Sequence, residues 1–155
     1  DHAIVSLNLT GLGIVGKFPD IPSESFKELR VLDLSNNSLA GTIPRVNITS
    51  FLKLQELNLA DNELNGSIPE SIGYYPELLV LNLSGNQLKG LLPFSFGNLT
   101  ALVELNLSGN TFLSGQVPIL PNLSLLDITG TGLFEHEGIS SFPRPTVIPA
   151  DELGK

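Results

Sequence analysis

The sequence predicts an α/β solenoid of about five to six repeats, with short parallel β-strands on a concave face and loops and short 3-10 or α turns on a convex face. A recurring leucine pattern, an asparagine at a fixed place and a later Gly-x-apolar-Pro carry this prediction. The first strand leucine stands at positions 7, 32, 57, 81, 105 and 126, so the steps are 25, 25, 24, 24 and 21 residues. Such periods are typical of solenoids, whose repeats bury a core by stacking.

The repeat is most regular in residues 54–69, whose sequence is LQELNLADNELNGSIP. Side chains of a β-strand alternate between its two faces. We therefore expect Leu57 and Leu59 to point into the core and Asn58 to point out of it. Gly66 and the proline three residues later are expected to turn the chain, because glycine tolerates unusual dihedrals and proline lacks an amide donor.

Further copies precede and follow this one along nearly the whole chain. Residues 7–19 form an imperfect first copy, whereas residues 29–44 and 78–93 match closely. Residues 102–118 carry one inserted residue, and a sixth, incomplete copy stops matching after Leu133. Apolar residues between the copies are expected to fill the convex side: Ile48, Phe51, Ile72, Tyr75, Phe96 and Leu99.

An asparagine follows each of the four most regular strands: Asn37, Asn62, Asn86 and Asn110. A buried side-chain amide donates and accepts hydrogen bonds, so it satisfies the backbone groups of adjoining turns. We interpret this row as a structural ladder rather than as a row of ligand-binding amides. Leu12 and Thr131 occupy the matching places at the two ends, where a ladder has one neighbour.

The periodicity divides the chain into two parts. Residues 1–133 are predicted to form the solenoid, and residues 134–155 to form an extended C-terminal tail that partly caps the last repeat. The tail contains three prolines, and Phe134, Ile139 and Phe142 are its expected contacts with the last strand. Covering that strand protects an edge that would otherwise pair with another chain.

Composition excludes several classes of function. The net charge of −8 comes from scattered acidic residues, which opposes nucleic-acid binding, and without cysteine the chain has no disulfide. No stretch reaches 18 apolar residues, so no direct membrane insertion is expected. His2 and His136 show neither metal-ligand spacing nor a paired nucleophile. We therefore predict no enzyme activity, no cofactor and no metal site.

Three stretches carry a family resemblance: LAGTIP at 39–44, LNGSIP at 64–69 and GNLT at 97–100. They resemble the plant-specific subclass of leucine-rich repeat proteins, found in ectodomains of receptor-like kinases and receptor-like proteins and in polygalacturonase-inhibiting proteins. The resemblance implies a leucine-rich repeat solenoid that binds a protein or peptide ligand outside the cell through its concave or lateral face. Family ectodomains begin with a cysteine-paired cap that residues 1–7 lack. The sequence is therefore expected either to have lost the cap or to be part of a larger chain or complex.

The open face of the predicted strands carries three columns of side chains. The column between the two strand leucines and the column after them have repeat-typical Asn, Asp, Ser and Thr, which indicates a solvated hydrogen-bonding array. The column before the first leucine mixes acidic and apolar residues, so we expect partner contacts there. Its candidate partner-binding residues are Val31, Glu56, Val80, Glu104 and Leu125.

Eight Asn-x-Ser/Thr sequons suggest a secreted glycoprotein. Those at Asn8, Asn82 and Asn106 lie in strands, and at the latter two a glycan would obstruct the concave face. The candidate acceptors are Asn47, Asn98, Asn122, Asn36 and Asn65, of which Asn47 is favoured because its segment is irregular.

The leading hypothesis is a non-catalytic extracellular or cell-surface recognition module that binds a protein or peptide. Resemblance to the polygalacturonase-inhibiting proteins leaves open a soluble inhibitor of a cell-wall-degrading glycosidase, and a structural spacer in a larger assembly is a third possibility. Ice binding by the hydroxyl column is disfavoured, because threonine occurs in it only at Thr10 and Thr129.

Overall fold

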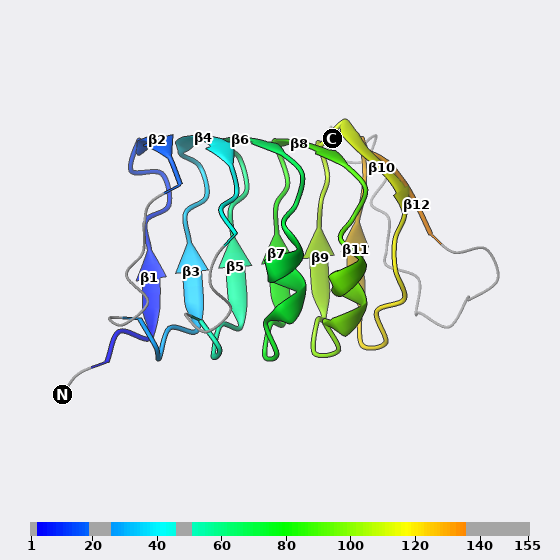
Figure 1. Ribbon diagram of the computed structural model, residues 1–155. Coiled ribbons are helices and arrows are strands. Elements are labelled where there is room, and N and C mark those ends of the chain that lie inside the picture. The colour runs from blue at the N-terminus through cyan, green and yellow to red at the C-terminus, as the bar shows by residue number, and fades with distance from the viewer. Residues whose placement is uncertain (1–2, 19–25, 46–50, 136–155) are drawn as a thin grey trace, which may run out of the picture.

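The computed structural model describes residues 3–18, 26–45 and 51–135. Its first sheet has six parallel strands that follow one another in chain order (Figure 1). Each strand is three residues long, and its central leucine points inward: β1 (Ser6–Asn8), β3 (Val31–Asp33), β5 (Glu56–Asn58), β7 (Val80–Asn82), β9 (Glu104–Asn106) and β11 (Leu125–Asp127). The predicted solenoid with parallel strands is confirmed.

A second parallel six-stranded sheet, which the sequence did not predict, runs along the neighbouring side of the solenoid. Gly66 was expected to turn the chain, yet it is the last residue of a strand and has a φ of 76°. The extended stretch around each such glycine pairs with the same stretch of the next coil. The strands are β2 (Val15–Lys17), β4 (Ser38–Thr42), β6 (Glu63–Gly66), β8 (Gln87–Gly90), β10 (Phe112–Gln116) and β12 (Gly132–Phe134).

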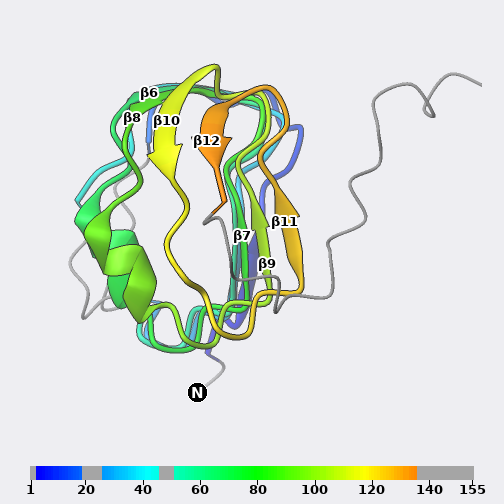
Figure 2. The same cartoon turned by 90° about the vertical axis from the view of Figure 1, so that its right-hand side faces the viewer.

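Among the described residues, two short 3-10 helices lie on the convex side, η3 (Glu70–Tyr74) and η4 (Phe94–Asn98). Each begins directly after a proline, whose missing amide donor costs nothing at that position. Viewed along the solenoid, the helices lie opposite the first sheet, and the second sheet closes the section between them (Figure 2). They pack closely, since a Cβ at Gly73 would overlap the backbone and hydroxyl of Ser95.

The core lies between the sheets and the convex turns. The strand leucines of the central coils are buried, and so are the predicted convex residues that the structure describes, Phe51, Ile72, Tyr75, Phe96 and Leu99. Ile48 lies outside the described residues. Burial of each of the larger apolar side chains contributes about 1.5–3 kcal/mol. A single coil buries too few of them to offset the conformational entropy that its chain loses on folding.

The last coil completes both sheets before the described chain ends. β11 pairs with β9, and β12 pairs with β10, so the coil extends the solenoid to Phe134. The tail contacts predicted for Ile139 and Phe142 lie outside the described residues. The proposed boundary between solenoid and tail therefore stays a prediction.

Candidate functional site

The register of the first sheet aligns the candidate partner-binding residues in one row. Glu56 pairs with Val31 on one side and with Val80 on the other, and Glu104 pairs with Val80 and Leu125. Adjacent strands are about 4.8 Å apart. The row, which we name the first column, therefore runs across the concave face with apolar and acidic side chains in alternation.

Side chains of the first column have no polar partner among the described residues. Val31, Glu56 and Val80 are half-buried, and Glu104 and Leu125 are exposed, with Leu125 45% exposed. Neither glutamate forms a hydrogen bond or ion pair within the described chain. These groups can meet a partner without first breaking an internal contact.

The column between the two strand leucines is used by the fold instead. In each coil its Asn or Asp accepts a hydrogen bond at Oδ1 from the amide two residues later, at 2.9 to 3.2 Å. The hydroxyls of Ser35, Ser84 and Ser108 donate to the same oxygens. This geometry fixes the turn that follows each strand.

Asp33 is the charged member of that column in the second coil. Burial acts to raise the pKa of its carboxyl, but hydrogen bonds from Ser35, Thr10 and Asn58 outweigh burial and hold the pKa below its ordinary value. Asp33 therefore stays ionised in mildly acidic conditions, where its charge contributes to the acidic character of the concave face.

The asparagine row lies inside the coil, away from the concave surface. Asn86 donates from Nδ2 to the carbonyl oxygens of Leu59, Leu83 and Ser84 at 2.9, 3.1 and 3.1 Å, and its Oδ1 accepts from the Leu64 amide at 3.0 Å. Equivalent contacts are made by Asn37, Asn62 and Asn110. Each amide thus joins two consecutive coils, which leaves no donor for a ligand.

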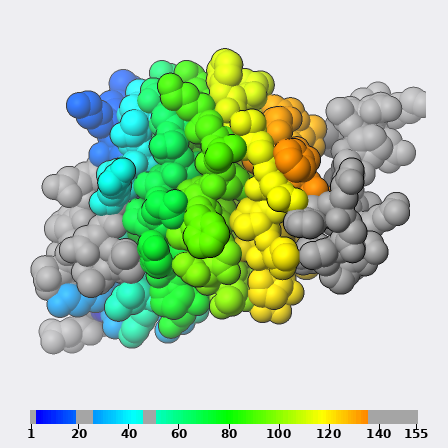
Figure 3. Space-filling view, turned by 45° about the vertical axis from the view of Figure 1, so that its right-hand side comes forward, coloured from blue at the N-terminus to red at the C-terminus, as the bar shows by residue number. Residues whose placement is uncertain are grey.

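Exposed apolar side chains gather on the side of the molecule between the second sheet and the 3-10 helices. Leu91 is 69%, Phe94 95% and Ile119 53% exposed, and we name these three residues the side patch. Leu91 and Phe94 line one hollow of about 660 Å³, and Phe94 and Ile119 line a second of about 460 Å³. Figure 3 brings this side of the green and yellow coils forward.

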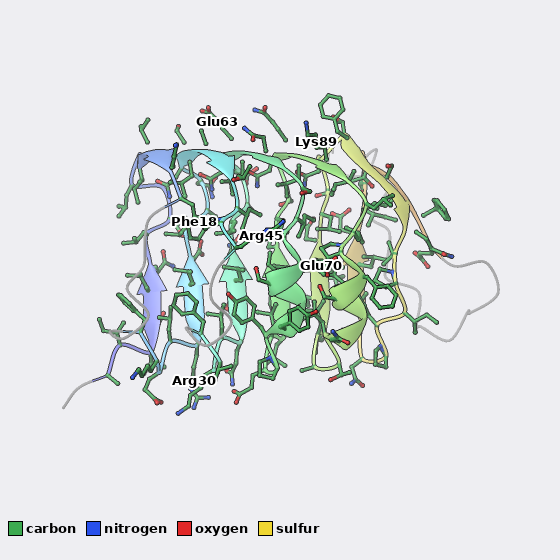
Figure 4. All side chains as sticks on the ribbon, in the orientation of Figure 1. Phe18, Arg30, Arg45, Glu63, Glu70 and Lys89 are labelled. Carbon is green, nitrogen blue, oxygen red and sulfur yellow. The ribbon has the colours of Figure 1, made fainter. Side chains whose placement is uncertain are left out.

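Sequence reasoning missed the side patch, although a signal was present. The residue after the repeat proline is Arg45, Glu70, Phe94 and Ile119 in successive coils. Its character changes from charged to apolar halfway along the solenoid. Figure 4 shows Arg45 and Glu70 on this side, with Glu63 and Lys89 along the second sheet and Arg30 at the opposite edge.

Glu70 shows how the charged end of that row is held. Its Oε2 accepts a hydrogen bond from the Ser95 amide at 3.1 Å, and the Ser95 hydroxyl donates to its backbone oxygen at 2.7 Å. Hydrogen bonds from Ser95 and from the Phe94 amide lower the pKa of Glu70 below its ordinary value. Burial raises the pKa of Tyr75 to about 12, so this phenol stays protonated in the core.

The glycosylation candidates lie in different surroundings. Asn36 has a φ of 54°, and Asn65 lies in the middle of the second sheet on β6. Asn98 ends η4 and is exposed, whereas Asn122 donates from Nδ2 to the Thr100 oxygen at 2.6 Å. Asn47 lies outside the described residues.

Two searches of the described residues bear on other functions. They contain no group of three or more His, Asp or Glu placed to hold a metal ion. In the same part of the chain, no helix has the length and apolar character that crossing a membrane requires.

Plant proteins are among the solved structures that are similar to this chain. The peptide hormone receptor RGFR1 in complex with RGF2 is 40% identical with a TM-score of 0.75, over 83% of this chain and 21% of the receptor. The BIR2 ectodomain from Arabidopsis thaliana is 34% identical with a TM-score of 0.74, over 88% of this chain and 71% of that one. A plant ice-binding protein is 30% identical with a TM-score of 0.70, over 83% of this chain and 49% of that one.

The chain therefore spans about a fifth of the hormone receptor and most of the BIR2 ectodomain. No curated protein sequence matches it. Residues 6–137 match the family described as leucine-rich repeat region. Together with the in-register coils and the plant receptor ectodomains that share them, this match shows that the chain belongs to the plant-type leucine-rich repeat proteins.

Proposed function

We propose that this chain is a non-catalytic recognition module that binds a protein or peptide through the first column of its concave face. The observation that carries this proposal is the alternation of Val31, Glu56, Val80, Glu104 and Leu125 along one registered row without internal polar partners. Exposed apolar groups beside unpaired charges are what a partner surface needs, because burial of the former supplies affinity and pairing of the latter supplies specificity.

Similarity to receptor ectodomains supports the proposal. RGFR1 has been solved with the peptide hormone RGF2, and BIR2 is likewise a plant ectodomain. Because the chain spans a fifth of RGFR1, we propose that it acts within a larger chain or complex, at the cell surface or outside the cell.

The acidic members of the concave face favour a partner with basic side chains. Glu56 and Glu104 lie two strands apart with Val80 between them, and Asp33 adds a charge in the next column. The three concave columns contain no lysine or arginine. A partner that presents a basic residue beside an apolar one would meet both kinds of group.

Substitution of Val80 by arginine tests the site. Val80→Arg places a long charged side chain in the centre of the first column, so capture of the partner from a plant extracellular extract is expected to be lost. Gln87→Arg is the matched control, because it adds the same charge to the same coil on the exposed second sheet. Equal capture by Val80→Arg and the wild type would contradict the choice of this column.

An extracellular location would make the protein a glycoprotein, with Asn47, Asn98, Asn122, Asn36 and Asn65 as the proposed acceptors. Mass spectrometry of the protein isolated from its native tissue tests this part of the proposal. A mature protein without sugar at any sequon would remove the support for secretion.

Similarity to a plant ice-binding protein, 30% identical over most of this chain, raises ice binding as an alternative function. The hydroxyl column that would face ice is irregular, with Ala60 in the middle and Ser84 and Ser108 donating to neighbouring asparagines. We therefore expect no difference in thermal hysteresis between the protein and buffer. A measurable thermal hysteresis would support ice binding as the function and count against partner recognition.

A further inference from the structure

The side patch is unusual for the free surface of a soluble protein. Phe94 is 95% exposed, and it occupies the place that holds Arg45 and Glu70 in the two preceding coils. Ile119 follows at the same place in the next coil. Contiguous exposed apolar groups mark a surface that another group covers. The change from charged to apolar residues therefore indicates that the side patch is covered.

Asn98 lies at the rim of the same hollow. It lines the hollow of about 460 Å³ together with Phe94 and Ile119, four residues along the chain from Phe94. Asn98, Leu99 and Thr100 form a sequon, and the side chain of Asn98 makes no hydrogen bond to another described residue. Its amide nitrogen is therefore available for modification.

Six other sequons lie among the described residues. Nδ2 of Asn122 is held by the Thr100 oxygen. Asn8, Asn82 and Asn106 lie in concave strands with Oδ1 engaged. Asn65 lies within the second sheet, and Asn36 follows a concave strand with a φ of 54°. None of the six lines either hollow at the side patch.

The chemistry of the hollow suits a sugar. Its walls carry no charged side chain, and they combine the Phe94 ring, Ile119 and two prolines with the amide of Gln116. The C–H face of a pyranose ring packs on an aromatic ring, while its hydroxyls stay in water or meet an amide. The volume lies within the range of about 300–1,000 Å³ usual for small-molecule sites.

The preceding coil supplies an internal comparison. There Glu70 stands in place of Phe94, and Tyr74 stands in place of Asn98, so this place in the coil has neither a sequon nor the apolar residue. With no sequon four residues later, the residue after the proline is charged and exposed to water. The two features occur together in the coil of Asn98.

We propose that Asn98 carries an N-linked glycan whose first sugars pack over Phe94 and Ile119. In the transfer, Nδ2 of Asn98 loses a proton and forms a bond to the anomeric carbon of a lipid-linked oligosaccharide, and the lipid diphosphate leaves. The proposal rests on entry into the secretory pathway, which is part of the proposed function. With the side patch covered by sugar, the concave face stays free for a partner.

The test uses the full chain secreted from plant or insect cells. Peptide mass spectrometry is expected to find Asn98 occupied. Asn98→Gln is expected to raise the fluorescence of a dye that reports exposed apolar surface, because the patch loses its cover while glycans elsewhere stay. The Phe94→Glu background, which copies the preceding coil, is expected to abolish that rise. Asn122→Gln is the matched control and is expected to leave the signal unchanged.

Three outcomes would overturn the proposal: an unmodified Asn98 beside occupied sequons elsewhere, equal dye binding by Asn98→Gln and the wild type, or a rise that persists with Phe94→Glu. Melting temperatures of all variants show that each is folded. Absence of sugar at every sequon would instead count against secretion. Partner capture by Val80→Arg is a separate measurement, so the two proposals can fail independently.

Discussion

The first coil and the fourth coil share the two strand leucines but differ in how deeply these leucines are buried. Leu81, Leu83 and Leu88 of the fourth coil are fully buried, whereas Leu7 and Leu9 of the first are only partly buried. The fourth coil has a neighbour on both sides and the first has one described neighbour. A leucine in this fold therefore owes its burial to the adjacent coils as much as to its own.

The position of the asparagine ladder also differs between the central coils and the first coil. Asn86 bonds to the backbone of its own coil and of the preceding one, whereas Leu12 stands at this place in the first coil and is 65% exposed. The described residues contain no coil before the first one for an asparagine at this place to join. Pattern regularity is thus greatest where two neighbours impose it.

Replacing a buried leucine should give the largest effect. Leu83→Ala leaves a cavity between two coils and is expected to reduce the free energy of unfolding by about 3–5 kcal/mol. Leu9→Ala removes the same atoms from a partly buried place, so a loss of about half that size is expected. Urea unfolding followed by circular dichroism measures both, and equal losses would show that a second neighbour adds nothing.

Removing a ladder amide should rank second. Asn86→Ala leaves the Leu64 amide and three carbonyl oxygens without this partner in the interior, which is expected to cost about 2–4 kcal/mol. Leu12→Asn in the first coil should change stability by less than about 0.5 kcal/mol, because the new amide finds no earlier coil among the described residues to join. A comparable cost for both variants would break the contrast between end and centre.

The buried leucines and the ladder asparagines are the features of the fold that the sequence predicts best. The leucine period and the asparagine row are set by stacking, which demands the same residue in each coil, so the solenoid and its core could be predicted. The second sheet could not, because stretches such as residues 38–42 contain a glycine with positive φ and have little strand propensity. They pair because the neighbouring coil presents the same stretch alongside, shifted by two residues.

The candidate sites could be predicted less completely from the sequence, because they are made of residues that depart from the repeat. Val80 and Glu104 could be chosen because they depart from the repeat while sharing a column. Phe94 and Ile119 depart from it in the same way, but their exposure depends on how the chain bends between the second sheet and the 3-10 helices. Repeating residues predict the fold. Which of the non-repeating residues lie on a common surface is known only from the three-dimensional structure.

A smaller effect is expected from a substitution at a turn residue with a positive φ, which differs between the central and the later coils. Asp61 has a φ of 52° at the place where Gly85 and Gly109 stand in later coils and Gly11 stands in the first. Asp61→Gly relieves this left-handed conformation and is expected to raise the free energy of unfolding by about 0.5–1 kcal/mol. Thermal unfolding measures the gain, and a lower melting temperature would mean that contacts of the Asp61 side chain outweigh the strain.

The smallest effect at neutral pH is expected for Asp33→Asn, because asparagine makes the same turn contact in four other coils. The pKa of Asp33 is lowered by folding. Its charge therefore stabilises the fold above about pH 4, the ordinary pKa of aspartate, and this contribution is lost as the pH falls through the lower folded value. Unfolding curves from pH 7 to pH 2.5 should show a shallower acid loss for the variant, and parallel curves would contradict this.

The fifth coil contains an additional residue between Asn110 and Leu113, and both sheets nevertheless keep their register on either side of it. The extra length is taken up where the chain passes from one sheet to the other, and Phe112 there is 69% exposed. This corner is therefore a natural insertion point for an epitope, a fluorophore or a binding loop. A foreign segment introduced at Thr111 would extend into solvent while the coils before and after it remain stacked.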